Sequence, residues 1–267
     1  MIGVGPRLAR GARRIGGRIR SAHPLALAAA VAVVAVLAVL AVRVNAPPAP
    51  YPASAVPPRI GVSDGDRVAD YEAAGRAELD GLGPYARVYA LVTLASYVPP
   101  EQLPDVVAAE GDVRPVIAFG RVPLPGRQTE IVRLGAQHLP DDVSRAMAET
   151  AIRKQREAAD YTQRAGAETE PERRALLTSN AEVSRAEAAS YATRCGCVYA
   201  LVVHASRAGL IRLAGHDLVR AVDPAPEVTD VSRAVFTPPL PEHVDVVGPL
   251  PDDLTSSDGA SAAVRSS

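Results

Sequence analysis

The chain is poor in the side chains that stack on bases or sugars. It has no tryptophan among its 267 residues, and aromatic residues make up only 4% of them. Proteins that bind nucleic-acid bases or carbohydrate rings by stacking need such side chains, so both classes are disfavoured. The sequence also lacks a P-loop, a Rossmann glycine fingerprint and a metalloprotease helix motif. We therefore expect no cofactor, no metal ion and no catalytic residues.

Acidic residues are missing from the first 42 positions. The first 23 residues instead carry six arginines, which are Arg7, Arg10, Arg13, Arg14, Arg18 and Arg20. Residues 24–42 follow without a charge and consist almost entirely of alanine, valine and leucine. At about 1.5 Å per residue, a helix over this run spans roughly 28 Å, close to the hydrocarbon thickness of a bilayer. The sequence predicts a basic cytoplasmic tail, residues 1–23, and one transmembrane helix, residues 24–42.

The arginines also predict the direction of insertion. Only Arg43 and Arg59 are basic in the twenty residues after the apolar run, so the N-terminus is expected in the cytoplasm and the rest outside. The N-terminal arginines are then expected to contact anionic lipid headgroups. A cleaved signal peptide is the alternative, although its apolar region usually runs only about 7–15 residues. The one small-residue cleavage site, Val44–Ala46, also precedes Pro47 and Pro48, which fit poorly in an extended protease site.

The charge balance changes sign beyond residue 42. With the six N-terminal arginines set aside, 23 basic residues face 30 acidic ones, and Lys154 is the only lysine. This mild acidity argues against a nucleic-acid partner. The expected partners of the exported part are another envelope protein, a second copy of the chain or a small envelope ligand.

Proline dominates residues 43–62. The six prolines after Asn45 are Pro47, Pro48, Pro50, Pro52, Pro57 and Pro58. Such density favours polyproline II at about 3.1 Å per residue, so the segment is predicted to be an extended linker. Ordered structure is predicted to begin at Ser63, which can cap a helix with Asp66 as the partner in a capping-box-like pair.

An internal repeat divides the remaining chain. Residues 88–96 (VYALVTLAS) and 198–206 (VYALVVHAS) are identical at seven of nine positions. Three weaker matches follow in the same order, which pair 113–116 with 219–222, 123–125 with 239–241, and 139–142 with 250–253. Chance similarity in a chain rich in alanine, valine, leucine and proline is the alternative, but the shared order favours a duplication. In equivalent strands Tyr89 and Tyr199 face the same side. Leu91 and Leu201 are then expected in matching core positions.

Each half of the repeat is predicted to fold as strand, short helix, strand. The predicted strands are residues 87–95, 114–122, 197–205 and 218–223. Two such units pair naturally into one helix-backed sheet. The predicted fold is α/β (α+β), a duplicated, ferredoxin-like β-α-β sheet. Its parts are a first half at 63–140, a second half at 195–253 and a disordered tail at 254–267.

The residues between the halves, 141–194, predict an antiparallel helical hairpin. Its first helix begins at Asp141 or Asp142, and its second at Pro171, inside a capping box of Thr169 and Glu172. The apolar stripe is narrow and consists of Val143, Met147, Ala151, Ala158, Tyr161, Leu176, Leu177, Val183 and Tyr191. The intervening positions are charged and include Arg153, Lys154, Arg156, Glu157 and Glu187. A stripe this narrow often packs on another chain; alternatively, one helix lies on the sheet with its charged face in solvent.

Cys195 and Cys197 are the only cysteines and the candidate disulfide. They fall on the predicted extracytoplasmic side, where disulfides persist. On a regular strand their Cα atoms would lie about 6.6 Å apart, near the upper limit for a bridge, although Gly196 permits a tighter turn. A structural disulfide within or between chains, two inert thiols, and a redox or metal-binding pair all remain open. Redox activity is disfavoured because Cys195 follows a helix C-terminus, which opposes a thiolate.

Histidines add two weaker alternatives. Ser206, His204 and Asp217 can be drawn as a hydrolase triad, but no nucleophile elbow or glycine-rich oxyanion loop accompanies them. Zinc held by the two cysteines with His204 or His216 needs an atypical ligand spacing. Structural roles are expected for these residues.

These features together predict a single-pass, membrane-anchored extracytoplasmic binding or interaction protein, sensory or scaffolding, without catalytic activity. The alternative is an envelope thiol–disulfide redox protein that uses Cys195 and Cys197.

Overall fold

The computed structural model describes residues 56–107 and 112–252. The predicted cytoplasmic tail and transmembrane helix, residues 1–42, lie outside these ranges, as do most of the linker and the tail at 254–267. Within the described ranges, no helix combines the length and the apolar character needed to cross a bilayer. The domain described below is the compact unit that starts at Val56.

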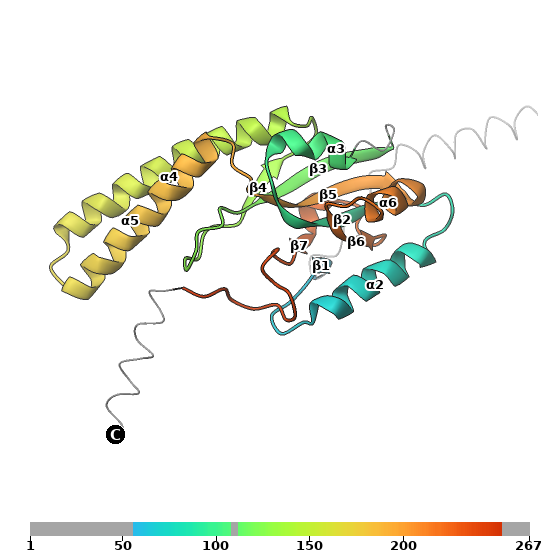
Figure 1. Cartoon of the computed structure of the whole chain (residues 1–267), viewed down its shortest axis with the longest axis horizontal. Helices are drawn as coiled ribbons and strands as arrows, with labels where there is room; N and C mark the ends of the chain where they lie inside the picture. The colour runs from blue at the N-terminus through green and yellow to red at the C-terminus, as the bar shows by residue number, and fades with distance from the viewer. Residues whose placement is uncertain (1–55, 108–111, 253–267) are drawn as a thin grey trace, which may run out of the picture. The chain divides into compact units, whose positions relative to one another are not determined.

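An antiparallel sheet of five strands forms the centre of the domain (Figure 1). In sheet order the strands are β4 (Val132–Gly135), β3 (Val113–Gly120), β5 (Val198–Ser206), β2 (Arg87–Val98) and β6 (Val219–Ala225). The central strand β5 is buried along most of its length, so its sequence is a nearly continuous apolar run. Two short strands, β1 (Arg59–Gly61) and β7 (Val235–Thr237), pair in parallel as a separate sheet. The predicted mixed α/β fold is confirmed.

Two strand–helix–strand connections build the main sheet. β2 leads through η1 (Pro100–Gln102) and α3 (Leu103–Val107) to β3, and β5 leads through α6 (Arg207–Ala214) to β6. In each connection a strand of the other half lies between the joined strands: β5 separates β2 from β3, and β2 separates β5 from β6. The similar segments 88–96 and 198–206 therefore pair with each other at the centre of the sheet.

Alternate side chains of the strands divide the core into two hydrophobic clusters. The first, on the helix-covered face, joins the sheet to α3, α6, the base of the hairpin and one end of α2 (Val68–Gly81), and includes Leu103, Leu210, Met147 and Tyr191. The second, on the opposite face, joins the sheet to β1, β7 and the chain after β6, through Ile60, Phe236 and Leu240. The second face is thus covered by short strands and loops and not by long helices.

In β2 and β5, which contain the two similar segments, matching residues face the same side of the sheet only at the start of each segment. Tyr89 and Tyr199 both contact the second cluster, as predicted. Leu91 also belongs to the second cluster, but Leu201 belongs to the first, so their predicted equivalence is wrong. Tyr199 is an extra residue in the pairing of β5 with β3, where Phe119 lies opposite Ala200 and Gly120 opposite Val198. Such a bulge reverses the alternation for every residue after it.

Order at the start of the domain differs in detail from the prediction. Strand β1 precedes Ser63 because Ile60 packs into the second cluster. Helix α2 begins at Val68 after Arg67, and no side chain caps it. The Asp66 carboxylate instead accepts a hydrogen bond from the backbone N–H of Ser63 at 2.7 Å. Asp66 therefore closes the turn before the helix, and the predicted cap does not form.

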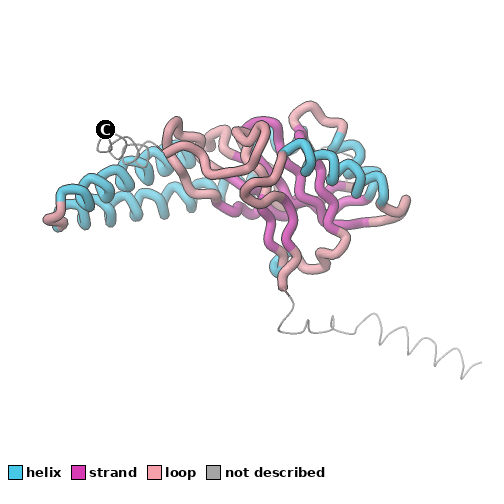
Figure 2. Tube along the Cα trace, turned by 90° about the horizontal axis from the view of Figure 1, so that it is seen from below, coloured by secondary structure: helices cyan, strands magenta, loops and turns pink. Residues whose placement is uncertain are grey.

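Helices α4 (Asp141–Ala167) and α5 (Pro171–Ala192) form the predicted hairpin. Val143, Met147 and Tyr191 lie at the end near the sheet and are completely buried in the first cluster. The other ends of both helices extend beyond the sheet in the cartoon and in the tube view (Figures 1 and 2). The hairpin is therefore part of the core at its base and projects from the domain at its far end.

The turn of the hairpin is held differently from the predicted capping box of Thr169 and Glu172. Pro171 opens α5 as predicted, but the N-cap is Glu170, and no side chain caps the helix. The carboxylate of Glu168 accepts hydrogen bonds from the backbone N–H groups of Thr169 and Glu170, at 2.9 and 3.0 Å. An acidic side chain before the helix thus satisfies N–H groups of the turn.

Helix α2 approaches the edge strand β6 closely at Gly75. A Cβ atom on Gly75 would lie 2.6 Å from the carbonyl oxygen of Val222, so a larger residue would push the helix away. Asp223, the next residue of β6, lies in this seam. Burial raises the pKa of Asp223 to about 7, with a further contribution from the negative charge of Glu78, while a hydrogen bond from the Gly61 N–H opposes the increase.

The raised pKa of Asp223 predicts that the domain loses stability as the pH rises. The folded-state pKa of about 7 lies above the unfolded value of about 3.9, so the protonated form favours folding, and this contribution disappears between about pH 4 and pH 7. Asp223→Asn is expected to raise the free energy of unfolding at pH 8 by up to about 4 kcal/mol and to flatten its dependence on pH. Urea unfolding between pH 4 and pH 8 measures this. Asp80→Asn, on the exposed side of α2, is the control, and equal behaviour of both variants would contradict the prediction.

Candidate functional site

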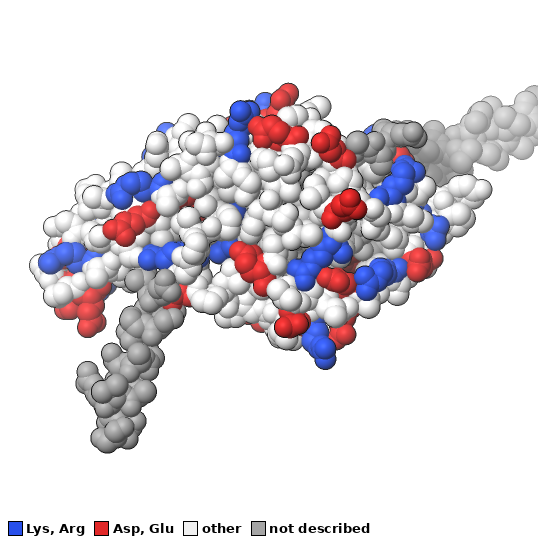
Figure 3. All heavy atoms as spheres, in the orientation of Figure 1, with Lys and Arg blue, Asp and Glu red and all other residues white. Residues whose placement is uncertain are grey.

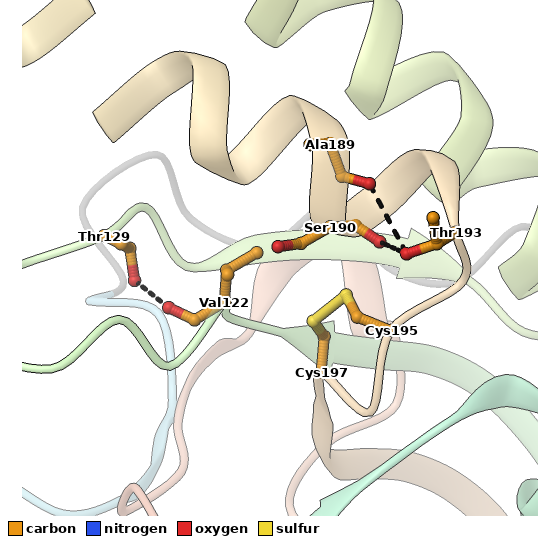
Figure 4. Close-up of a disulfide and its surroundings, with 7 residues drawn as sticks. All are labelled: Val122, Thr129, Ala189, Ser190, Thr193, Cys195 and Cys197. Atoms are coloured by element: carbon orange, nitrogen blue, oxygen red, sulfur yellow. Dashed lines mark hydrogen bonds between the residues drawn. A yellow bond between two sulfur atoms is a disulfide. The ribbon is translucent and has the colours of Figure 1, made fainter. Parts of the chain in front are cut away.

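Cys195 and Cys197 form an intrachain disulfide between the end of α5 and the start of β5 (Figure 4). Their Cα atoms are 5.2 Å apart, closer than on a regular strand. The closer approach is available because the chain bends here and β5 begins only at Val198. The candidate pair is thus brought together within one chain.

The bend before the disulfide comes from the way α5 ends. Thr193 is the C-cap, and Arg194 adopts a positive φ of 55°. The N–H of Arg194 donates to the Tyr191 carbonyl at 3.1 Å, and the N–H of Cys195 donates to the Ser190 carbonyl at 3.2 Å. This is the Schellman pattern, in which glycine usually occupies the left-handed position. An arginine tolerates that position at a conformational cost, and its guanidinium lies 3.0 Å from the carboxylate of Glu101.

The surroundings of the disulfide are mainly structural. Cys197 is completely buried in the first hydrophobic cluster, and Cys195 is half-buried beside it. The Cys197 carbonyl accepts a hydrogen bond from the Arg121 N–H at 2.8 Å, which fixes the bridge against the end of β3. A buried thiol is poorly accessible to an oxidant or a substrate disulfide. This arrangement suits a structural clamp that holds the turn between the end of α5 and the start of β5.

The histidine-based alternatives do not assemble. His204 packs against Tyr89, with ring centroids 4.9 Å apart and ring planes tilted by 53°. Ser206 is the N-cap of α6, where its hydroxyl accepts from the Gly209 N–H at 3.2 Å and donates to Asp112. Both cysteines are joined in the disulfide, and the described residues hold no cluster of ligands suited to a metal ion. The hydroxyl of Ser206 is therefore engaged in helix capping and not in a triad with His204.

A buried ion pair lies inside the hairpin. The Lys154 ammonium is 2.8 Å from the Glu187 carboxylate, and their side chains are only 4% and 1% exposed. Burial alone lowers the pKa of Lys154, but hydrogen bonds to Glu130 and Glu187 outweigh it and hold the pKa above its usual value. The sequence pattern placed both residues only among the charged positions between the apolar side chains and did not predict their burial. The one hint in the sequence is that Lys154 is the only lysine in an arginine-rich chain.

The loop between β3 and β4 contacts the Lys154–Glu187 pair and connects it to the sheet. The backbone N–H of Glu130 donates to Glu187 at 2.9 Å, and the Glu130 carboxylate lies 2.7 Å from the Lys154 ammonium. Arg127, in the same loop, donates to the backbone carbonyl and the hydroxyl of Ser179 on α5. The base of the hairpin is therefore fixed by packing, by charge and by the disulfide.

The outer part of the hairpin carries exposed apolar and charged side chains. Leu176 on α5, near the turn of the hairpin, is 51% exposed, and Ile152 in the middle of α4 is 50% exposed. Basic and acidic side chains are interspersed over the hairpin and the sheet domain on the face that Figure 3 shows. The helices touch each other through small residues, among them Ala158, Ala181 and Ala188, which allow close packing but leave longer side chains outside.

No protein-family model, no curated protein and no solved structure matches the chain.

Proposed function

We propose that the chain is a single-pass, membrane-anchored extracytoplasmic protein that binds another protein through the projecting hairpin and has no catalytic activity. The exposure of Leu176 at 51%, on a hairpin whose base is firmly fixed, is the observation that carries this proposal. Two long helices that extend beyond their own core offer a stiff surface with unburied apolar side chains. The partner is an envelope protein or a second copy of the chain.

The arrangement of the sheet supports a duplicated, ferredoxin-like origin for the domain. In each half, the strands joined by a short helix lie on either side of a strand from the other half. This is the split β-α-β arrangement, and the matching segments 88–96 and 198–206 take equivalent places in it. We infer that the hairpin was inserted between two copies of one unit, which is consistent with a function separate from the sheet.

The hairpin surface is tested by photo-crosslinking in the native membrane. A photo-reactive residue at Leu176 is expected to form adducts with a partner, because this side chain is exposed on the proposed binding arm. The same residue at Tyr85, which is 95% exposed away from the hairpin, is the matched control and should form none. Adducts of twice the mass of the chain indicate a second copy. Identical adducts from both positions, or none from Leu176, would contradict the proposal.

The proposed topology places residues from Asn45 onward outside the cytoplasm, with the N-terminal arginines at anionic lipid headgroups. Alkaline phosphatase fused at Ala55 or at Ser267 is expected to be active, because this enzyme folds only after export. A reporter that works only in the cytoplasm should be silent at both positions. Cytoplasmic activity at either fusion would reverse the orientation and remove the reason to expect a disulfide.

The competing function is a thiol–disulfide exchange protein that uses Cys195 and Cys197. The disulfide itself favours it, but Cys197 is completely buried. Mass spectrometry of the native protein after alkylation separates the two proposals. A bridge that resists mild reductant supports the structural clamp, and a pair that equilibrates rapidly with a redox buffer supports the exchange protein.

A further inference from the structure

A cavity of about 510 Å³ lies on the loop-covered face of the sheet. Its floor is formed by Phe119 of β3 and Tyr199 of β5, and its cover by Phe236 of β7 and by Leu240 and Leu250 of the following chain. The volume falls within the range of about 300–1,000 Å³ that is usual for small-molecule sites. The cavity is separate from the hairpin surface proposed above.

One wall of the cavity carries a nearly buried arginine with unused donors. Arg121 directly follows β3 and is 3% exposed. Its Nη1 donates to Tyr97 and Glu242, and its Nη2 donates to the Arg127 carbonyl, at distances of 2.8–3.2 Å. A guanidinium carries five N–H donors. Among the described residues nothing accepts from its Nε–H or from the second Nη2–H.

A second buried group in the same cavity also lacks a partner. Tyr199 is completely buried, and its hydroxyl forms no hydrogen bond with any described residue. Burial raises the pKa of Tyr199, so the hydroxyl stays protonated and is a donor at neutral pH. The oxygen has less than 1 Å² of accessible surface, so Tyr199 shapes the floor of the cavity and its hydroxyl is not open to an occupant.

The charge of the lining is biased toward one sign. Arg121 in the wall and the exposed Arg59 at the mouth are basic, and Asp64 is the only acidic residue that lines the described cavity. Glu242, outside the lining, pairs with Arg121 at 2.8 Å and offsets part of its charge. The remaining surface is largely apolar and aromatic, through residues such as Phe119 and Phe236. An occupant complementary to this lining combines an apolar body with a negatively charged group.

We propose that the cavity binds a small amphipathic carboxylate. The carboxylate group accepts hydrogen bonds from the free Nε–H and Nη2–H of Arg121, since guanidinium donors bind carboxylate oxygens in pairs. The apolar body packs between Phe119, Phe236 and Leu240. This binding site goes beyond the proposed function and does not require the hairpin to have a partner.

The test uses the full-length protein in lipid nanodiscs and two soluble probes. 4-Phenylbutyrate has the required carboxylate, and 4-phenylbutanol has the same apolar body without it. Ligand-observed NMR titrations, with empty nanodiscs as the baseline, are expected to show saturable binding of the acid at least tenfold tighter than binding of the alcohol. Equal affinities of the two probes, or no saturable binding of the acid, would overturn the proposal.

Variants locate the binding. Ile131→Trp places a large side chain at the cavity mouth, where Ile131 is 49% exposed, and is expected to reduce binding of the acid at least tenfold. Ile152→Trp, at a 50% exposed position outside the cavity lining, should leave binding unchanged. Arg121→Gln should lower the affinity for 4-phenylbutyrate at least tenfold and the affinity for 4-phenylbutanol less than twofold. If Arg121→Gln does not fold, the Ile131 and Ile152 pair decides alone: equal binding by both variants places the acid elsewhere and overturns the proposal.

Discussion

Lys154→Met is expected to lower the free energy of unfolding by about 3–5 kcal/mol. The substitution leaves the Glu187 carboxylate, which is 1% exposed, without the ammonium that lies 2.8 Å away in the native protein. Among the described residues, the N–H of Glu130, at 2.9 Å, is then the one hydrogen-bond donor left to this carboxylate. Removing one partner of a buried pair costs far more than removing both, because the remaining charge is left uncompensated in a poorly solvated site. Urea unfolding of the full-length protein, followed by tyrosine fluorescence, measures the loss.

The neighbouring Arg153 gives a matched control. Its guanidinium also contacts Glu130, at 2.8 Å, but its side chain is 48% exposed, so Arg153→Met should cost less than about 1 kcal/mol. The double variant Lys154→Met with Glu187→Leu should recover most of the loss of the single variant, since no buried charge is then left without a partner. A cost for Lys154→Met as small as that for Arg153→Met would show that the pair is solvated in solution.

Leu91→Ala and Leu201→Ala are each expected to lower the free energy of unfolding by about 2–5 kcal/mol. Both side chains are completely buried, one in each hydrophobic cluster, so each truncation leaves a cavity on a different face of the sheet. Leu176→Ala, on the outer part of the hairpin, should cost less than about 1 kcal/mol, because this side chain is 51% exposed. Urea unfolding of the three variants compares these costs directly.

The comparison also tests the projecting hairpin. If Leu176→Ala unfolds the domain while Leu201→Ala has little effect, the hairpin belongs to the core, and its role as a binding arm must be abandoned. If only Leu91→Ala is tolerated, the loop-covered face contributes little to stability, which would be unexpected for a cluster that contains Phe119 and Phe236. Similar losses at both leucines support a sheet that is packed on two sides.

Local patterns predicted much of the secondary structure. Apolar, β-branched runs predicted strands at 87–95 and 197–205, which the structure has as Arg87–Val98 and Val198–Ser206, because residues buried on both faces of a sheet leave a continuous apolar sequence. Pro171 fixed the start of the second hairpin helix, since proline suits the first helical position. These features depend on neighbours within one or two turns of chain. The tail, the transmembrane helix and the linker were read in the same way and stay predictions.

Contacts between distant segments set which face of the sheet each side chain occupies. The bulge at Tyr199 arises from pairing with β3, and it moved Leu201 to the opposite face from its counterpart Leu91. The Cys195–Cys197 bridge needed the left-handed turn at Arg194, an arginine where local preference would place glycine.

The residue pattern alone predicted four of the five strands of the main sheet, the helical hairpin and a candidate bridge between the two cysteines, but not the short strands β1, β4 and β7. The tertiary structure decided which charges are buried and where the cavity lies. Lys154 reaches Glu187 across the hairpin, and Arg121 reaches Glu242 across 121 positions of chain. Periodicity along a chain records how side chains alternate, but burial of a charge depends on what distant segments place beside it. Which distant segments come together is not visible in the pattern of a single sequence, so the burial of Lys154 and Arg121 could not be predicted from it.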